Sequence, residues 1–383
     1  MLGCLLAGCQ GGNPNQTTLN ARVLKHAIPP QLVGEFRQTR GQAVNLKFSP
    51  ESRLSDLFAR LQIWQRQAAR GKAEQSGNPL SFLPFLGSRS PAVADLVMLG
   101  DYWLQGAIAQ GIVQPLSRSP NWSQLSPAPI AWESLMRRDG EGRLDPEGKI
   151  WGAPYRWGCS AIAYRADKFK SLGWTPTDWS DLWRDEMARR ISVLDSPRET
   201  IGLTLKKLGR SYNEPDLDSI SELDGELERL QQQVRLYSST HYLQPLILGD
   251  TWLAVGWSSD ILPLLEYDRR IKAIVPRSGT SLWSDVWVRP ASAAKSDPEL
   301  LTAWMEFGWQ PNIARQLSIL TQAASPAISG RERSQLPPKL RDNQILLPDR
   351  AILENSEFLQ PLSKEAIGQY RSRWLTMRQN GSG

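Results

Sequence analysis

The sequence predicts an α/β fold, because apolar runs of strand length alternate with stretches that repeat at the helical period. Strands are predicted at residues 161–164 and 191–194, which are short and continuously apolar. An amphipathic helix is predicted across residues 220–237, where large apolar side chains recur at intervals of three and four. With 383 residues, 40% of them hydrophobic and 22% charged, the chain can bury a substantial core and has a globular composition.

The other elements are predicted in chain order from local signals. A helix is expected to begin at Ser49-Pro50-Glu51, because a capping serine, a proline at the first position and an early acid favour a helix start. Asp101 is expected to cap a helix that runs through Ala109, and a further helix is expected at residues 298–309. Further strands are predicted at residues 22–25, 44–48, 95–99, 253–257 and 285–289. Nowhere do 18 apolar residues follow one another, so no membrane-spanning helix is predicted.

The amino terminus resembles a lipidation signal. Leu6-Ala7-Gly8-Cys9 has the pattern of a bacterial lipobox, at which a signal peptide is cut before a cysteine that becomes lipidated. Residues 10–20 have the composition of a flexible tether. We therefore expect a periplasmic protein that is anchored to the membrane through Cys9. The alternative is a chance match, because the charged region and most of the apolar region that precede a lipobox are missing.

Several kinds of chemistry lack their sequence motifs. The chain has two histidines and no His-Glu-x-x-His, Cys-x-x-Cys or Gly-x-Ser-x-Gly motif, so neither a metal nor a cofactor is expected. The net charge of +6 comes from dispersed basic residues, which does not favour a nucleic-acid partner. A hydrolase that uses a pair of carboxylates remains an alternative.

Short segments that pair tryptophan with a carboxylate follow several of the predicted strands. They are Gly256-Trp257-Ser258-Ser259-Asp260, the stretch from Gly279 to Trp287 containing Trp283-Ser284-Asp285, and Leu194-Asp195-Ser196-Pro197-Arg198-Glu199. Together with Asp95-Leu96-Val97 followed by Tyr102-Trp103, and with Gly152-Ala153-Pro154-Tyr155-Arg156-Trp157-Gly158, they resemble the polyamine-binding (spermidine/putrescine-binding) proteins of ABC importers. The resemblance extends in order from about residue 90 to 325.

The resemblance implies a two-lobed periplasmic binding protein fold in which the chain crosses between the lobes and the ligand lies in the central cleft. One lobe would comprise residues 21–155 and 284–330, and the other residues 156–283 and 331–383, after a lipobox remnant and tether at residues 1–20. It further implies a monomeric solute-binding lipoprotein that delivers putrescine, spermidine or a similar small organic cation to an ABC permease. An envelope-retained hydrolase, or a sensor or scaffold on the same clamp fold, remains the alternative.

A polyamine needs carboxylates at its ammonium groups and aromatic walls along its methylene chain. Ammonium groups interact with indole faces by about 0.5–2 kcal/mol, and charge-assisted hydrogen bonds contribute about 1.5–3 kcal/mol. The resemblance implies ammonium ligands at Asp285 and Asp260, a further carboxylate at Glu199, stacking walls at Trp257, Trp283 and Tyr102, and a polar contact at Gln360.

Structural explanations compete with these roles. Glu199 stands three residues after Ser196 and could belong to a capping box, and Asp260 could cap the helix that follows it. Asp285 lies between apolar positions, so a partner is expected for its buried charge. The chain also departs from many relatives, which carry aspartate at the position of Ser196 and an aromatic residue near His26. A shorter diamine or another small cation therefore remains open as the ligand.

Overall fold

The structure of the chain, a computed structural model, describes residues 17–40, 44–77, 92–125, 130–294 and 296–379. Cys9 and most of the predicted tether lie outside these described residues, so the predicted lipidation site has no structural counterpart here. In the described part, strands and helices alternate along the chain, which confirms the predicted α/β class.

A single large sheet runs through the molecule. Its strands are β1 (Thr17–Leu24), β2 (Val44–Glu51), β3 (Leu96–Gly100), β4 (Val113–Gln114), β7 (Ala153–Arg165), β8 (Ile191–Val193), β9 (Val234–Tyr237), β10 (Leu253–Trp257), β11 (Ile271–Ile274), β12 (Ser281–Pro290) and β13 (Glu357–Phe358). The main order is β2-β1-β3-β12-β7-β10-β8-β9. In addition, β4 and β13 pair with β12, and β11 pairs with β7. Two short strands, β5 (Arg137–Arg138) and β6 (Lys149–Ile150), form a separate pair.

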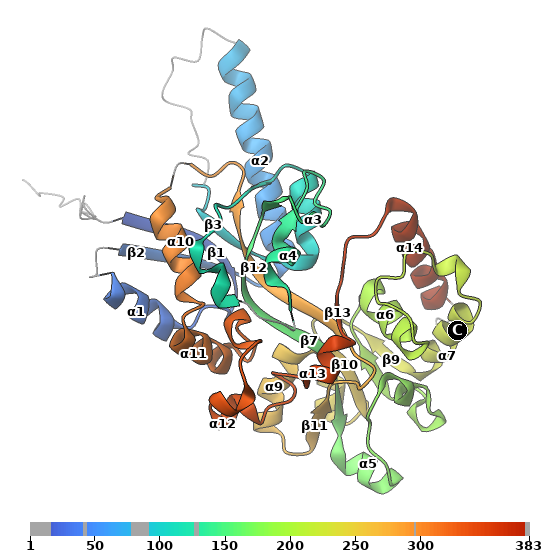
Figure 1. Cartoon of the computed structure of the whole chain (residues 1–383). Coiled ribbons are helices and arrows are strands. Elements are labelled where there is room, and N and C mark those ends of the chain that lie inside the picture. Colours follow the sequence, from blue (N-terminus) through green and yellow to red (C-terminus); the bar gives the residue numbers. More distant parts are fainter. Residues whose placement is uncertain (1–16, 41–43, 78–91, 126–129, 295, 380–383) are drawn as a thin grey trace, which may run out of the picture.

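Helices cover both ends of this sheet. They are α1 (Pro30–Thr39), α2 (Leu54–Gly77), α3 (Asp101–Ala109), α4 (Trp132–Met136), α5 (Ala166–Leu172), α6 (Pro197–Lys207), α7 (Leu223–Gln233), α8 (Gln244–Leu248), α9 (Ser258–Tyr267), α10 (Pro298–Phe307), α11 (Pro311–Thr321), α12 (Pro338–Arg341), α13 (Arg350–Glu354) and α14 (Lys364–Gln379). In Figure 1, one group that includes α1, α10 and α11 lies to the left of β7 and β12, and another that includes α6, α7 and α14 lies to the right.

Strands β7 and β12 join the two groups. Every residue of β7 is buried, as expected for a strand covered on both faces. The two strands pair antiparallel from Leu282 opposite Cys159 to Trp287 opposite Ala153. We call β7 and β12 together the crossing ribbon. Two of the three predicted lobe boundaries, 155/156 and 283/284, fall inside this ribbon, whereas the third, 330/331, does not, and the division of the chain between the lobes stays a prediction.

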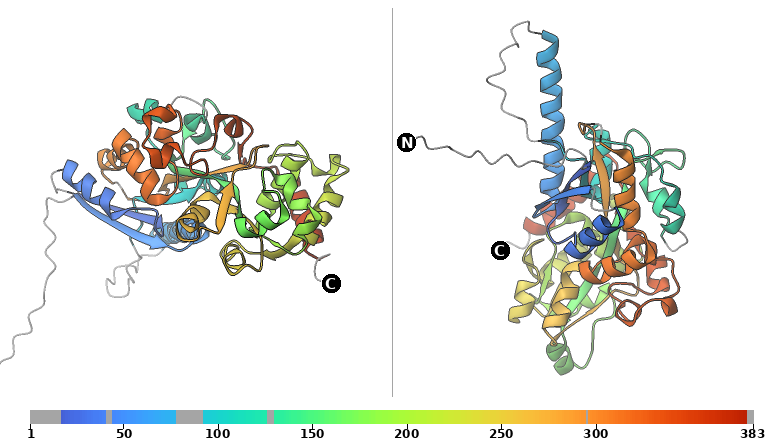
Figure 2. Two further views of the ribbon diagram at one scale, coloured as in Figure 1. Left: turned by 90° about the horizontal axis from the view of Figure 1, so that it is seen from below. Right: turned by 90° about the vertical axis from the view of Figure 1, so that its left-hand side faces the viewer.

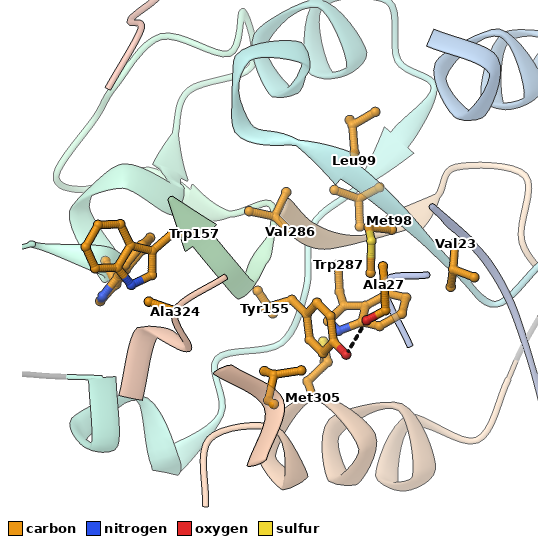
Figure 3. Packing of buried hydrophobic residues seen from close by; sticks show 14 of the residues in the cluster. Val23, Ala27, Met98, Leu99, Tyr155, Trp157, Val286, Trp287, Met305 and Ala324 are labelled. Atoms are coloured by element: carbon orange, nitrogen blue, oxygen red, sulfur yellow. Dashed lines mark hydrogen bonds between the residues drawn. The ribbon is translucent and has the colours of Figure 1, made fainter. Parts of the chain in front are cut away.

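Aliphatic and aromatic side chains pack together in the core beside the crossing ribbon (Figure 3). Tyr155 packs edge-to-face on Trp287, with ring centroids 5.3 Å apart, and its hydroxyl donates a 2.9 Å hydrogen bond to the carbonyl of Ala27. The buried phenol therefore has a partner, as burial requires. A second cluster of buried residues lies around β8 and β9 and includes Tyr370 of α14.

Two of the predicted elements are wrong at their ends. Residues 49–51 do not start a helix, because β2 continues to Glu51 in parallel register with β1, and α2 begins only at Leu54. The helical period across residues 220–237 also misleads, since α7 ends at Gln233. Residues 234–237 form β9 instead, because they pair in parallel with β8, and this tertiary pairing overrides the local pattern.

Helix α2 is the most extended feature of the molecule. Figure 1 and the right-hand view of Figure 2 show it projecting away from the rest of the protein. Its 24 residues correspond to about 36 Å at 1.5 Å per residue. Across the residues that the structure describes, no helix combines the length and the apolar character that crossing a bilayer demands.

Candidate functional site

The crossing ribbon brings the predicted ligand residues of β12 opposite specific residues of β7. Asp285 pairs with Arg156 on β7 and with Gly100 on β3, and Trp283 pairs with Gly158. Because side chains two residues apart on a strand share a face, Asp285 and Trp283 lie on one face of the ribbon. The register shifts between Asp285 and Val286, which is a local irregularity of the kind that re-aims side chains near functional sites.

Asp285 has the partner that its burial requires. Arg156 Nε lies 2.7 Å from Asp285 Oδ2, and the two side chains are only 7% and 3% exposed. A carboxylate in such a place needs both charge compensation and a hydrogen bond, and Arg156 supplies both. The partner is therefore a residue of the chain itself, so a ligand would meet an ion pair at this position and not an isolated carboxylate.

A second carboxylate lies beside this ion pair. Asp101 is the first residue of α3, and its Oδ1 accepts a 2.8 Å hydrogen bond from the backbone N–H of Ser284. Burial raises the pKa of Asp101 to about 7, and the charge of Asp285 adds to this, while the Ser284 N–H and the charge of Arg138 oppose it. Its predicted role as a helix cap is wrong, because Gly100 occupies the cap position and α3 receives no side-chain cap.

The indole of Trp283 lies directly over the backbone of β7. A Cβ atom at Gly158 would come within 2.5 Å of Trp283 Cζ2 and within 2.5 Å of Ser258 Oγ. Only glycine leaves this space free, so the sequence at Gly158 permits the close approach of Trp283 to the ribbon. The indole remains half-buried, as a stacking wall would be.

Glu199 reaches the same ribbon from α6. Its Oε2 accepts hydrogen bonds from Ser160 Oγ at 3.0 Å and from Ser281 Oγ at 2.6 Å, so both serine hydroxyls point to one carboxylate oxygen. Burial raises the pKa of Glu199, and hydrogen bonds from these serines and from the Trp257 side chain partly offset the effect. Ser196 caps α6 by accepting from the Glu199 N–H, so the cap uses the backbone of Glu199 and leaves the carboxylate for the ribbon.

Trp257 and Asp260 are held together by Tyr242. The Tyr242 hydroxyl donates to Asp260 Oδ2 at 3.0 Å and accepts from the backbone N–H of Trp257 at 3.2 Å. Asp260 is solvent-exposed, although the protein atoms crowded around it raise its pKa, with the nearby charge of Arg156 opposing. Its exposure limits the size of that shift. Asp260 lies in the first turn of α9, but the cap position belongs to Trp257.

The two remaining predicted residues lie near Arg198. Tyr102 is 49% exposed at the start of α3, and it is close enough to Arg198 on α6 to influence the pKa of that guanidinium. Gln360 contributes its main chain: its carbonyl accepts from Arg198 Nη1 at 3.0 Å, and its N–H donates to Asn213 Oδ1 at 2.7 Å. The structure thus places Tyr102 and the main chain of Gln360 in the neighbourhood of Arg198, which precedes Glu199 on α6.

These residues form a row along one side of the crossing ribbon, which we call the ribbon strip. It runs from Asp101, Asp285 and Arg156 past Trp283 to Glu199, Trp257 and Asp260. Ser160 stands four positions after Arg156 on β7, which corresponds to about 13 Å at 3.3 Å per residue. The strip therefore offers charged groups at two separated places with an indole between them.

Sequence reasoning missed Arg156, Asp101 and Tyr242 as members of this strip. Arg156 had a detectable signal, because its charge lies between the aromatic residues Tyr155 and Trp157, much as that of Asp285 lies between Trp283 and Trp287 in β12. Two opposite charges in two buried strands are natural partners. Tyr242 gave no comparable signal, since a tyrosine in a polar loop has many possible roles.

A groove of about 710 Å³ lies elsewhere on the molecule, where β1 and β2 end. It is lined mainly by apolar side chains, among them Val23, Ile28, Val33 and Phe48. None of the seven predicted ligand residues lines it. The charged and hydrogen-bonding groups that could recognise a solute gather instead on the ribbon strip. Among the described residues, no group of His, Cys, Asp and Glu side chains is placed to hold a metal ion.

Two groups of helices on a sheet whose crossing strands carry charged and aromatic side chains define the class of two-lobed periplasmic binding proteins. The chain belongs to the family described as bacterial extracellular solute-binding protein, which matches residues 92–356. This family membership confirms the resemblance that the sequence motifs indicated, and it favours solute binding over the hydrolase alternative.

Characterised relatives have low but extensive similarity to this chain. The spermidine/putrescine-binding periplasmic protein of Escherichia coli is 26% identical over 268 residues, which is 69% of this chain and 72% of that protein. The putrescine/cadaverine-binding protein of Pseudomonas aeruginosa is 23% identical over 287 residues, covering 70% of this chain and 78% of that protein.

Solved structures of the same class have the same fold. The spermidine/putrescine ABC transporter substrate-binding protein PotD of Streptococcus pneumoniae superposes with a TM-score of 0.75 at 18% identity, covering 96% of this chain and 100% of that chain. The Tp0655 (TpPotD) lipoprotein of Treponema pallidum gives a TM-score of 0.68 at 16% identity, covering 94% and 99%. These likenesses confirm the predicted two-lobed fold.

Proposed function

We propose that this protein captures a small organic cation of the polyamine class, such as putrescine or spermidine, outside the cytoplasm and delivers it to an ABC permease. The observation that carries the proposal is the ribbon strip, on which four carboxylates and two indoles gather around the strands that join the lobes. The names of the relatives, which bind spermidine, putrescine or cadaverine, support the same ligand class.

The electrostatics of the strip favour a cation. Asp101, Glu199 and Asp260 all have raised pKa values, which means that their surroundings penalise the negative charge more than the protein compensates it. An ammonium group would supply the missing compensation through charge-assisted hydrogen bonds. Trp283 and Trp257 would contact the methylene chain and the cation through their ring faces.

The position of the strip suits a protein that closes on its ligand. The strip is built on β7 and β12, where the two lobes join, so bending of these strands would change the distance between Tyr102 on α3 and Arg198 on α6. A solute that contacts both sides would stabilise the closed arrangement, which a permease could then recognise. Lipidation of Cys9 would keep the protein at the membrane where that permease lies; replacement of Cys9 by serine would then release it from membranes.

Thermal unfolding of the purified protein with and without polyamine tests the proposal. A ligand at a hundredfold excess over its Kd stabilises the native state by about 2.7 kcal/mol, so putrescine, spermidine or cadaverine should raise Tm. The same titration on Asp260→Asn should give a smaller shift, and on Glu228→Gln, an exposed residue of α7, an unchanged one. Absence of any shift with cations of this kind, together with no small amine co-purifying by mass spectrometry, would refute the proposal.

A further inference from the structure

Arg156 has more hydrogen-bond donors than the protein uses. A guanidinium carries five N–H donors. Its Nε donates to Asp285, but among the described residues no hydrogen bond is found for either Nη atom. Fully enclosed polar atoms without a partner do occur in the described chain, Trp283 Nε1 among them, yet the Nη atoms of Arg156 do not belong to that set. They therefore keep contact with solvent although the side chain is only 7% exposed.

The other arginine beside the strip, Arg198, has partners in the chain for both of its Nη atoms, although its Nε is buried without one. Arg198 Nη1 donates to the Gln360 carbonyl at 3.0 Å, and its Nη2 donates to Asn213 Oδ1 at 2.8 Å. The outward edge of Arg198 is thus saturated by the chain. The two Nη atoms of Arg156, in contrast, have no partner in the described chain. Donors of this kind, which are almost enclosed but still reach solvent, are suited to bind a hydrogen-bond acceptor of a ligand.

The charges around Arg156 are mixed. Asp285 is in direct contact with it, Asp101 lies next to Asp285, and Asp260 is close enough for the charge of Arg156 to act on it. A diamine presents only positive donors, so one of its ammonium groups would face the like charge of the guanidinium. A molecule with one ammonium and one carboxylate would satisfy both signs, because two parallel N–H groups of a guanidinium match the two oxygens of a carboxylate.

We propose that the preferred ligand is a linear amino carboxylate, whose carboxylate binds the two Nη atoms of Arg156 and whose ammonium group, at the end of a short methylene chain, binds the carboxylates of the ribbon strip. This inference rests on the proposed function as far as solute capture on the ribbon strip is concerned, and it replaces one ammonium group of the proposed diamine by a carboxylate. It makes Arg156 the residue that separates amino acids of this shape from the diamines of equal length.

Matched ligands test the inference on the unaltered protein. Isothermal titration of the purified full chain compares putrescine with 4-aminobutyrate, cadaverine with 5-aminopentanoate, and 1,6-diaminohexane with 6-aminohexanoate. The expected result is that, for the chain length that binds best, the amino carboxylate has a Kd at least tenfold lower than the diamine. If the diamine binds as tightly or more tightly, the inference is overturned while the proposed function stands. If none of the six binds, the inference is overturned, and a titration with spermidine then decides whether the proposed function stands.

Two variants then assign the effect to Arg156. Arg156→Met should raise the Kd of the amino carboxylate at least tenfold, and the Kd of the diamine should stay unchanged or fall. Arg143→Met, at an exposed position, should change neither Kd. The double variant Arg156→Met/Asp285→Asn removes both charges of the buried pair. If the single variant does not fold, the amino carboxylate and the diamine are compared on this double variant instead. An amino-carboxylate preference that survives in a folded variant without Arg156 would overturn the assignment.

Discussion

Arg156 Nε donates a 2.7 Å hydrogen bond to Asp285 Oδ2 across strands that are 129 residues apart in sequence. Both side chains are almost fully enclosed, so the pair is a buried salt bridge at the point where the chain crosses between lobes. Buried pairs of this kind balance a large desolvation cost against their attraction, and the loss of one member leaves the other uncompensated. The pair therefore contributes to the charge of the ribbon strip and depends on the register of β7 on β12.

Arg156→Met should destabilise the protein by about 3–5 kcal/mol, because the carboxylate of Asp285 is then buried without a partner. The double variant Arg156→Met/Asp285→Asn should recover most of this loss, since it removes both charges. Equilibrium unfolding in urea, followed by circular dichroism, measures both effects. A double variant that is as unstable as the single one would show that the pair acts through packing and not through charge.

The exposed pair of Arg143 with Asp139 provides the control for this measurement. Its atoms approach to 3.0 Å, but the arginine side chain is 66% exposed and water solvates both charges. Arg143→Met should therefore leave the urea midpoint close to that of the unaltered protein. The contrast between two arginine-to-methionine changes isolates the consequence of burial.

Gly158→Ala should displace the Trp283 indole, because the new Cβ would lie 2.5 Å from Cζ2 of that ring. We expect a lower Tm and a reduced ligand-induced rise in Tm. Gly225 on α7 serves as the matched control, since nothing lies within 4 Å of a Cβ added there. Gly225→Ala should stabilise the protein by up to about 1 kcal/mol, through the better helix propensity of alanine. An unchanged ligand response in Gly158→Ala would remove Trp283 from the site.

Much of the fold follows from patterns that are local in the sequence. The apolar run at residues 191–194 and the capped, proline-initiated start of the helix at residues 298–309 are both present in the structure, as β8 and α10. The sixteen tryptophans of the chain differ in burial: Trp64, Trp132, Trp157 and Trp287 are fully buried, whereas Trp257 and Trp283, the two predicted stacking walls, remain partly accessible.

What local patterns cannot provide is the pairing of distant segments. The partner of Asp285 depends on the register of β12 against β7, and the strand character of residues 234–237 depends on β8, which lies about 40 residues earlier in the chain. The role of Ser160 and Ser281 as donors to Glu199 similarly arises only when three elements meet. Long-range pairing therefore limits prediction at the site more than it limits prediction of the fold.

Glu199→Gln should separate ligand affinity from stability. Burial already raises the pKa of Glu199 and so penalises its charge in the folded protein, and the amide keeps an oxygen that can accept from Ser160 and Ser281. The variant should consequently be as stable as the unaltered protein or more stable. The Kd of a cationic ligand should rise about tenfold or more. Glu228→Gln, on the exposed face of α7, is the control and should alter neither quantity. Unchanged affinity in Glu199→Gln would exclude its carboxylate as an ammonium ligand.

The contribution of Asp101 to stability should fall as the pH rises from about 4 to about 7. The pKa of Asp101 is raised from 3.8 to about 7 by burial, so in this window the folded protein keeps a proton that the unfolded chain releases. The folded state then binds more protons, and the free energy of unfolding decreases with pH, by at most about 1.4 kcal/mol per unit for one group. Asp101→Asn should flatten the slope, since the amide can still accept from Ser284 and does not titrate.

Asp268→Asn is the control, because the pKa of Asp268 is lowered to about 2 beside Arg270, and its contribution is lost only below pH 4. Urea midpoints at pH 4.5, 5.5, 6.5 and 7.5 measure the slopes, and equal slopes for the protein and Asp101→Asn would contradict a proton on Asp101.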